Sequence, residues 1–225
     1  MTRYLFPLIL GIGGCAILLW LGFWQLDRLE WKRTMLDEIE ARISGAPVEL
    51  PPEGTDTREL KYTPVVLVGA TTGQEVLVLS GQKGVGAGYQ VISAFETGEG
   101  RRVLVDRGFL PEATRMGDRP ATAMIVTGNL HWPEETDSFT PPPDPKTGIH
   151  FARDVPAIAA HMGTEPILIV AARIEGDTQG VTPQPIAITG IPNDHLNYAI
   201  TWFSLALVWA VMTLALLWRI RRQQI

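Results

Sequence analysis

Two long runs without a charged residue lie near the two ends of this 225-residue chain and limit what it can fold into. Residues 4–26 and residues 196–218 would each form a helix of roughly 35 Å. The hydrocarbon core of a bilayer is about 30 Å thick, so either helix is long enough to cross it. A water-soluble core helix of this length would normally carry a polar stripe. The two runs therefore predict two transmembrane helices.

The first run differs from a cleaved signal peptide. Its apolar part is longer than the typical 7–15 residues, and no small-x-small cleavage site follows it. Cys15 follows a short stretch that resembles a lipoprotein cleavage box, but the residues after it are again apolar. We therefore expect an uncleaved anchor. Together with Gly11, Gly14 and Ala16, Cys15 forms a group of small side chains that would let a second helix approach closely.

Charge at the second run predicts the orientation. Arg219, Arg221 and Arg222 follow this run directly, and positively charged flanks are usually cytoplasmic. Residues 219–225 would then be a cytoplasmic basic tail, with the N-terminus on the same side and the middle of the chain outside. Because no amphipathic Arg- and Ser-rich transit segment precedes the first run, the sequence favours a bacterial inner membrane with a periplasmic domain.

The segment between the two runs is acidic. It holds all 24 acidic residues and 15 of the 19 basic residues, a net charge of −9, which argues against a nucleic-acid surface. Apolar residues spaced by three and four predict that the first helix continues to about residue 43, where Ser44-Gly45-Ala46-Pro47 would end it. Residues 47–60 have the composition of a linker.

Residues 47–191 have the pattern of a β-rich domain. Six short strand-like runs are separated by turns, and a short helix is predicted over residues 154–161. The runs are Val65–Val68, Glu75–Leu79, Tyr89–Phe95, Arg102–Asp106, Met124–Leu130 and Ile167–Arg173. The glycine-rich stretch 81–88 lacks the ending of a phosphate-binding loop and reads as a hairpin loop. We expect a mainly antiparallel β-sandwich or partial barrel with a minor helical part.

Catalytic patterns are missing from the sequence. There is no P-loop, nucleophile elbow or H-x-x-x-H motif, and a single cysteine excludes an internal disulfide and a CxxC site. His131, His150 and His161 are scattered, and we expect each to be structural or exposed. The sequence therefore predicts a protein that is not an enzyme, and a membrane-anchored enzyme of unknown type is the least supported reading.

His195 differs from the other histidines because it lies at the outer mouth of the second predicted span. Tyr198 and Trp202 follow it at spacings that place all three on one helix face. Aromatic side chains are common at membrane interfaces, but an ionisable group at this depth is a candidate functional residue.

The first span leaves the membrane on the same side through Trp24, Arg28 and Trp31, which share a helix face with Gln25 beside them. A histidine, an arginine and several aromatic side chains suit a flat, metal-bearing ring with carboxylates: the histidine as axial ligand, the arginine on the propionates and the aromatics in stacking contact. The alternative is that these side chains anchor the helices among lipid headgroups. The residues alone do not separate the two readings.

An ordered set of motifs resembles the surfeit locus family of cytochrome c oxidase assembly factors. No single motif is decisive, but the set runs in order from about residue 20 to 205, and Phe109 stands where a tryptophan is expected. The motifs are Gly22-Phe23-Trp24-Gln25 with Arg28, Trp31 and Lys32; Tyr62 with Pro64 to Gly69; Gly88 to Ile92; Val103 to Pro111; Gly128 to Leu130 with Trp132-Pro133-Glu134; Phe151 to Val155; and Pro192 to Ala199 with Thr201-Trp202-Phe203.

The resemblance implies an assembly factor for haem–copper oxidase that binds haem a and assists its insertion into subunit I. The family's proposed haem ligand is the histidine at the head of the second span, which is His195 here. Expected partners are oxidase subunit I, haem a synthase and the lipid bilayer. A haem-free scaffold that stabilises nascent subunit I is the alternative, and homo-oligomerisation stays open. In the matching stretch, Asp106 and Arg107 are expected to form a buried pair that holds a turn.

Overall fold

The computed structural model describes residues 2–55 and 58–222. Residues 56–57 of the predicted linker and residues 223–225 of the predicted basic tail lie outside the described residues. The chain forms two compact units. One contains the chain up to Glu38 together with the part from Ile188 onwards, and the other is Ile39–Ala187.

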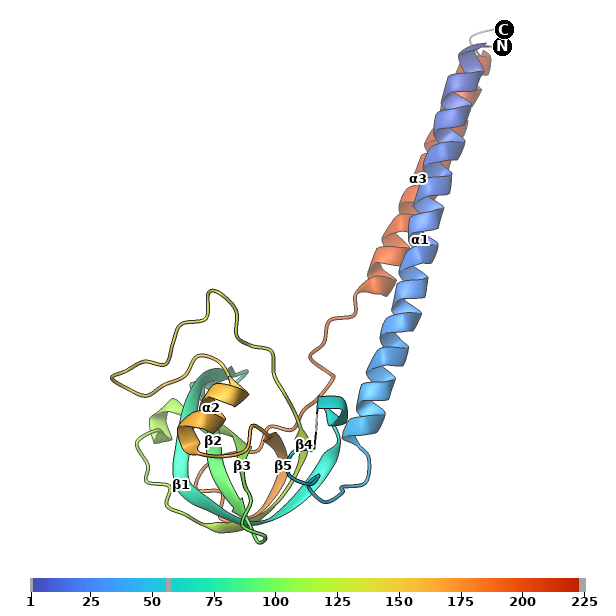
Figure 1. The fold of residues 1–225 in the computed structure, drawn as a ribbon. Coiled ribbons are helices and arrows are strands. Elements are labelled where there is room, and N and C mark those ends of the chain that lie inside the picture. Colours follow the sequence, from blue (N-terminus) through green and yellow to red (C-terminus); the bar gives the residue numbers. More distant parts are fainter. Residues whose placement is uncertain (1, 56–57, 223–225) are drawn as a thin grey trace. The chain divides into compact units, whose positions relative to one another are not determined.

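Two long helices, α1 (Thr2–Ile43) and α3 (His195–Arg222), make up most of the first unit (Figure 1). Both are long and apolar enough to cross a membrane, as the two charge-free runs predict. With 42 residues, α1 is about 63 Å long and continues well beyond the apolar run. The fold therefore has two candidate membrane helices, one on each side of the β domain in the sequence.

Small residues allow the two helices to approach closely. A Cβ atom added to any of three glycines of α1 would lie 2.2–2.5 Å from a side-chain atom of α3. The contacting pairs are Gly11 with Thr213, Gly14 with Trp209 and Gly22 with Phe203. The residue numbers rise along α1 as they fall along α3, so the helices are antiparallel. This confirms the close approach predicted from the small side chains around Cys15.

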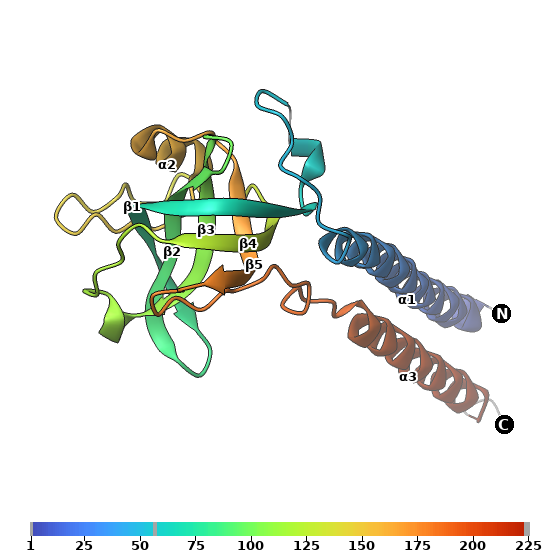
Figure 2. The same ribbon diagram turned by 90° about the horizontal axis from the view of Figure 1, so that it is seen from below.

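The second unit contains a closed five-stranded barrel, with the strands in the order β1-β2-β3-β5-β4 (Figures 1 and 2). The neighbouring strands are antiparallel except for β3 and β5, which are parallel. The strands are β1 (Pro64–Gln82), β2 (Gly86–Thr97), β3 (Arg102–Pro111), β4 (Ala123–Leu130) and β5 (Leu168–Gly176). This confirms the expected mainly antiparallel β domain, as a closed barrel rather than a sandwich.

The prediction of two separate strands at 65–68 and 75–79 was wrong, because β1 runs through both. The polar stretch between them suggested a turn. In the structure this stretch contains an irregularity in the register between Thr71 and Glu75, which bends the strand without ending it. As a result β1 pairs with β4 through its first half and with β2 through its second half. One strand thereby serves both neighbours and helps to close the barrel.

Apolar side chains form two main clusters on the two faces of the sheet. One cluster takes residues from all five strands, among them Val105, Phe95 and Ile169, and fills the barrel. The other contains Leu104 and is covered by α2 (Val155–Met162), through residues such as Ile158. Strand β3 is buried on both faces, and apolar residues lie on either side of its buried Asp106 and Arg107.

The local signals for the short helix and the hairpin are confirmed. Asp154 caps α2 by accepting a hydrogen bond from the Ala157 N–H at 3.1 Å, and Gly163 ends the helix in the left-handed conformation. The stretch 81–88 connects β1 to β2, whose last pair is Gln82 and Gly86. This glycine-rich stretch is therefore part of a hairpin.

Candidate functional site

His195 and Gln25 meet within the helix pair. His195 is the first residue of α3, and its Nδ1 lies 2.8 Å from Oε1 of Gln25 in α1. An amide oxygen can only accept a hydrogen bond, so with Oε1 as the partner Nδ1 of the imidazole is the donor. In the neutral ring the lone pair is then on Nε2. The Gln25 side chain is only 9% exposed, whereas His195 is partly buried.

The other predicted site residues lie on the same two helices. Trp24 and Trp31 are exposed, and the Arg28 guanidinium lies 4.4 Å from the centroid of the Trp31 ring. On α3, Tyr198 is exposed and Trp202 is partly buried. None of these five makes a hydrogen bond to His195 among the residues that the structure describes. They present aromatic and cationic surface on the two helices, and the direct contact with His195 belongs to Gln25.

Sequence analysis placed Gln25 beside the aromatic cluster but gave it no role. One feature of the sequence could have indicated that Gln25 faces α3. Gln25 is three residues after Gly22, and Gly22 contacts Phe203 of α3. Trp24 lies about 100° around the helix from Gln25. Only the packing of α1 against α3 shows which of the two faces the partner helix, and that packing depends on side chains distant in the sequence.

The barrel domain contains an ionic network around Arg153, in which the Asp106 carboxylate is buried. Nη1 of Arg153 lies 3.1 Å from Oδ2 of Asp106, which is 1% exposed, and the same guanidinium pairs with Glu135. Asp106 also accepts a hydrogen bond from the Gly108 N–H at 3.0 Å. Burial raises the pKa of Asp106, and Arg153 offsets part of that rise. The network connects β3 to Glu135 and Arg153, which lie in the segment between β4 and α2.

The expected pair of Asp106 with Arg107 was therefore wrong. Arg107 has no partner on β2, because a bulge separates the pairs Ile92–Asp106 and Val91–Gly108, and its guanidinium binds groups other than the Asp106 carboxylate. Arg107 is 1% exposed and donates instead to the Thr178 carbonyl at 2.8 Å and to Oε1 of Gln179 at 3.0 Å. Burial lowers the pKa of its guanidinium. Its contacts hold the segment that follows β5, which is a structural task.

The stability of the barrel domain should depend on pH through His131. This ring stacks on Tyr62 with centroids 5.6 Å apart, and burial, with Arg153 and Lys61 nearby, lowers its pKa from 6.5 to about 4. Below pH 6.5 the unfolded chain binds a proton that the folded chain does not, so stability falls as the pH drops from 6.5 to 4. We expect a loss of about 1–2 kcal/mol after allowing for solvent screening, measured by chemical denaturation of the detergent-solubilised protein.

The control is His131→Phe, which keeps an aromatic ring for the stack and removes the titrating group. This variant should lose less stability than the wild type between pH 6.5 and pH 4. Equal losses in the two proteins would show that His131 is not responsible.

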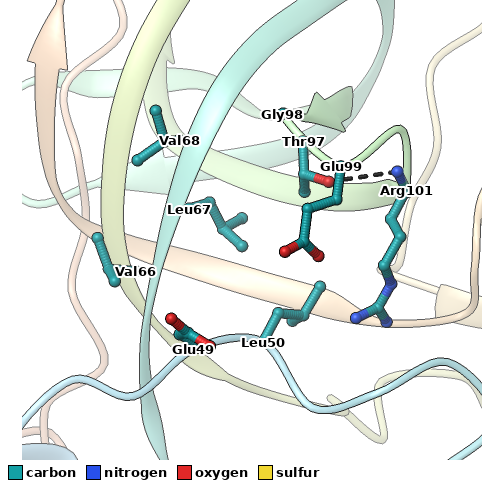
Figure 3. A pocket seen from close by; sticks show the side chains of 9 residues that line it. All are labelled: Glu49, Leu50, Val66, Leu67, Val68, Thr97, Gly98, Glu99 and Arg101. Carbon is teal, nitrogen blue, oxygen red and sulfur yellow. Dashed lines mark hydrogen bonds between the residues drawn. The ribbon is translucent and has the colours of Figure 1, made fainter.

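A pocket of about 280 Å³ lies on the barrel domain, beside the first half of β1 (Figure 3). Glu49, Leu50, Glu99 and Arg101 are among its lining residues. The Arg101 guanidinium is already engaged, because it pairs with Glu165 at 2.7 Å and donates to a backbone carbonyl. No histidine or cysteine lines the pocket. Its donor set therefore does not suit haem iron, and the helix pair remains the better candidate site.

The described part of the chain contains no group of three or more His, Cys, Asp or Glu side chains that could hold a metal ion. An iron porphyrin brings most of its ligands with it and needs only an axial ligand from the protein. His195, whose Nδ1 is fixed, fits the single axial ligand that such a group requires. The fold and the site together define a protein with two candidate membrane helices, a β-barrel and a histidine at the head of the second helix.

Comparison with known proteins gives the family. The model of the SURF1 family matches residues 13–207, so the chain belongs to the SURF1 family, known for cytochrome oxidase assembly factors. Surfeit locus protein 1 of Xenopus tropicalis is 31% identical over 207 residues, which cover 82% of this chain and 67% of that protein. The human protein of the same name is 28% identical (83% and 69% covered), and a SURF1-like protein of Drosophila melanogaster is 30% identical (83% and 69%).

Proposed function

We propose that this protein binds haem a at His195 and assists its insertion into subunit I of a haem–copper oxidase, without catalytic turnover of its own. The observation that carries the proposal is the state of the His195 ring. Nδ1 is held by Gln25, and Nε2 makes no hydrogen bond with residues 2–55 or 58–222. A neutral imidazole with one engaged nitrogen is the usual form of a histidine that ligates a metal.

Residues around His195 supply the other contacts that a porphyrin needs. When bound, haem a supplies an iron whose axial position the Nε2 lone pair can fill. Arg28 stacks on Trp31 and keeps its N–H edge for the propionates. Trp24, Trp31, Tyr198 and Trp202 offer apolar faces to the ring. A site with a single protein ligand at an accessible position can release its cargo, as a carrier must.

The charge pattern supports the proposed placement in the cell. Arg219, Arg221 and Arg222 end α3, which favours cytoplasmic termini and a periplasmic barrel in a bacterial inner membrane. Because haem a is apolar, transfer within the plane of the membrane is reasonable. Haem a synthase would deliver the cofactor and subunit I would receive it, with the barrel as the docking domain.

The His195→Ala variant should lose haem a. The wild type, purified in detergent from cells that make haem a, should show a Soret band, and the variant should retain less than about a tenth of it, because its one protein ligand to iron is gone. The control is His161→Ala, which removes an exposed histidine of α2 and should retain the full absorbance.

Full occupancy by haem a in His195→Ala would overturn the ligand assignment. A colourless wild-type protein from the same cells would overturn the proposal as a whole. If that colourless protein co-purified with subunit I, the haem-free scaffold would be the function.

A further inference from the structure

Gln25 is a buried amide in an otherwise apolar stretch of α1, and its contact with His195 has a specific chemical consequence. We propose that Gln25 is a positioning residue that fixes the tautomer and the orientation of the His195 ring, so that Nε2 is presented to iron. The inference rests on the proposed role of His195 as the ligand. It adds a second residue, from the other helix, that makes the histidine competent to bind.

The tautomer matters because a neutral imidazole has one protonated nitrogen. If the proton is on Nε2, that atom has no lone pair and cannot bind iron. With Oε1 of Gln25 at 2.8 Å from Nδ1, the proton is held on Nδ1. The same bond restricts rotation of the ring. Ligating histidines usually donate their second ring N–H to an oxygen in this way.

The position of Gln25 is itself fixed by packing one turn away. Gly22 leaves space for the Phe203 ring, because an added Cβ would lie 2.5 Å from Cε1 of that ring. Phe203 also packs edge-on against Phe23, with ring centroids 5.3 Å apart. These contacts set the distance between α1 and α3 next to the hydrogen bond. The acceptor is therefore held in place before any ligand arrives.

A packing role alone explains Gln25 poorly. The side chain is 91% buried, and a buried amide is costly unless its hydrogen bonds are made. Leucine has a similar size and would fill the same space between two candidate membrane helices without that cost. The amide is useful where a specific acceptor is needed, and its acceptor oxygen faces the His195 ring.

The test compares Gln25→Leu with Gln25→Glu. Leucine removes the acceptor at similar volume, whereas glutamate keeps an oxygen acceptor at the same place. The matched control is Gln82→Leu, the same change in the β1–β2 hairpin. The first readout needs no haem: the ¹⁵N NMR spectrum of histidine-labelled protein in detergent at about pH 8. The His195 signals are assigned by their loss in His195→Ala.

The wild type should show His195 with the proton on Nδ1, and Gln25→Leu should shift its population toward the Nε2-protonated form. Haem a should dissociate from Gln25→Leu about tenfold faster than from the wild type. Gln25→Glu and Gln82→Leu should both retain the wild-type tautomer, and the dissociation rate of each should stay within about twofold. If Gln25→Leu is too unstable to purify, the inference is tested by the wild-type tautomer and by the tautomer and haem a dissociation rate of Gln25→Glu.

Two results would overturn the inference. One is a wild-type His195 with its proton on Nε2, which would mean that the Gln25 amide donates to Nδ1. The other is a Gln25→Leu protein that keeps both the tautomer and the haem a dissociation rate. Failure of the proposed function is a different result: no haem a in the wild type, whatever the tautomer. A wild type that has the proton on Nδ1 but binds no haem a would confirm the contact between Gln25 and His195 and contradict its proposed role in haem binding.

Discussion

Replacing Arg153 by methionine is expected to destabilise the barrel domain by about 3–5 kcal/mol. The change removes the cation that lies 3.1 Å from the Asp106 carboxylate, which is 1% exposed. Burial already raises the pKa of Asp106, and without Arg153 it should rise further. The folded state would then bind the Asp106 proton more tightly than the unfolded chain does. The penalty should therefore shrink as the pH falls toward the ordinary carboxyl range.

Chemical denaturation of the detergent-solubilised protein at pH 7 and at pH 5 measures both effects. The double variant Asp106→Asn/Arg153→Met removes the stranded charge and should recover part of the loss at pH 7. Arg173→Met is the matched control, since that arginine is 71% exposed and its ion pair with Glu175 should contribute less than about 1 kcal/mol. A loss below about 1 kcal/mol in Arg153→Met would show that the buried network adds little to stability.

The Gly108→Ala substitution should destabilise the barrel by about 3 kcal/mol or more, because two penalties add. The residue has φ +112°, where an L side chain is strained by about 1–3 kcal/mol. Its new Cβ would also lie 2.1 Å from the Thr182 carbonyl oxygen and 2.6 Å from Cα of Pro183. Both are backbone atoms, so the segment after β5 would have to move. The paired hydrogen bonds between Phe109 and Thr182, at 2.8 and 2.9 Å, would be lost with that movement.

Gly100→Ala separates the two penalties. Gly100 also has a positive φ, +83°, but no atom lies within 4 Å of its added Cβ. This variant should lose only the strain energy, about 1–2 kcal/mol. Amide hydrogen exchange at Phe109 and Thr182 gives a second readout, since both N–H groups should lose protection in Gly108→Ala and keep it in Gly100→Ala. Similar losses of stability in the two variants would show that the backbone contact is unimportant.

The parts of the fold that could be predicted from sequence depend on local physics. A charge-free run of 23 residues is long enough to cross a bilayer whatever surrounds it, and Asp154 and Gly163 mark the ends of α2 by their own chemistry. The continuity of β1 was missed because Thr71 and Thr72 have the polarity of a turn. Their place in a strand follows from pairing with β2 and β4, which lie far apart in the sequence.

The same division applies to the candidate site. His195 could be recognised in the sequence by its residue type and by its place at the head of an apolar run. Its contact with Gln25 could not be read from the sequence, because it depends on how α1 is rotated about its axis against α3. From the spacing alone, the helix face that carries Trp24 was as suitable for contact with α3 as the face that carries Gln25. The glycines at positions 11, 14 and 22 decide the rotation, since α3 approaches where α1 has no side chains.

The strand order also has a consequence for the time at which the barrel can form. Strand β5 lies between β3 and β4 and is the last strand to be synthesised. Until it arrives, β3 and β4 each have an unpaired edge, and such edges readily pair with other chains. A nascent chain that has reached only residue 167 therefore cannot close its sheet. Slow synthesis of the segment 131–176 would lengthen the period in which the domain is most prone to aggregate.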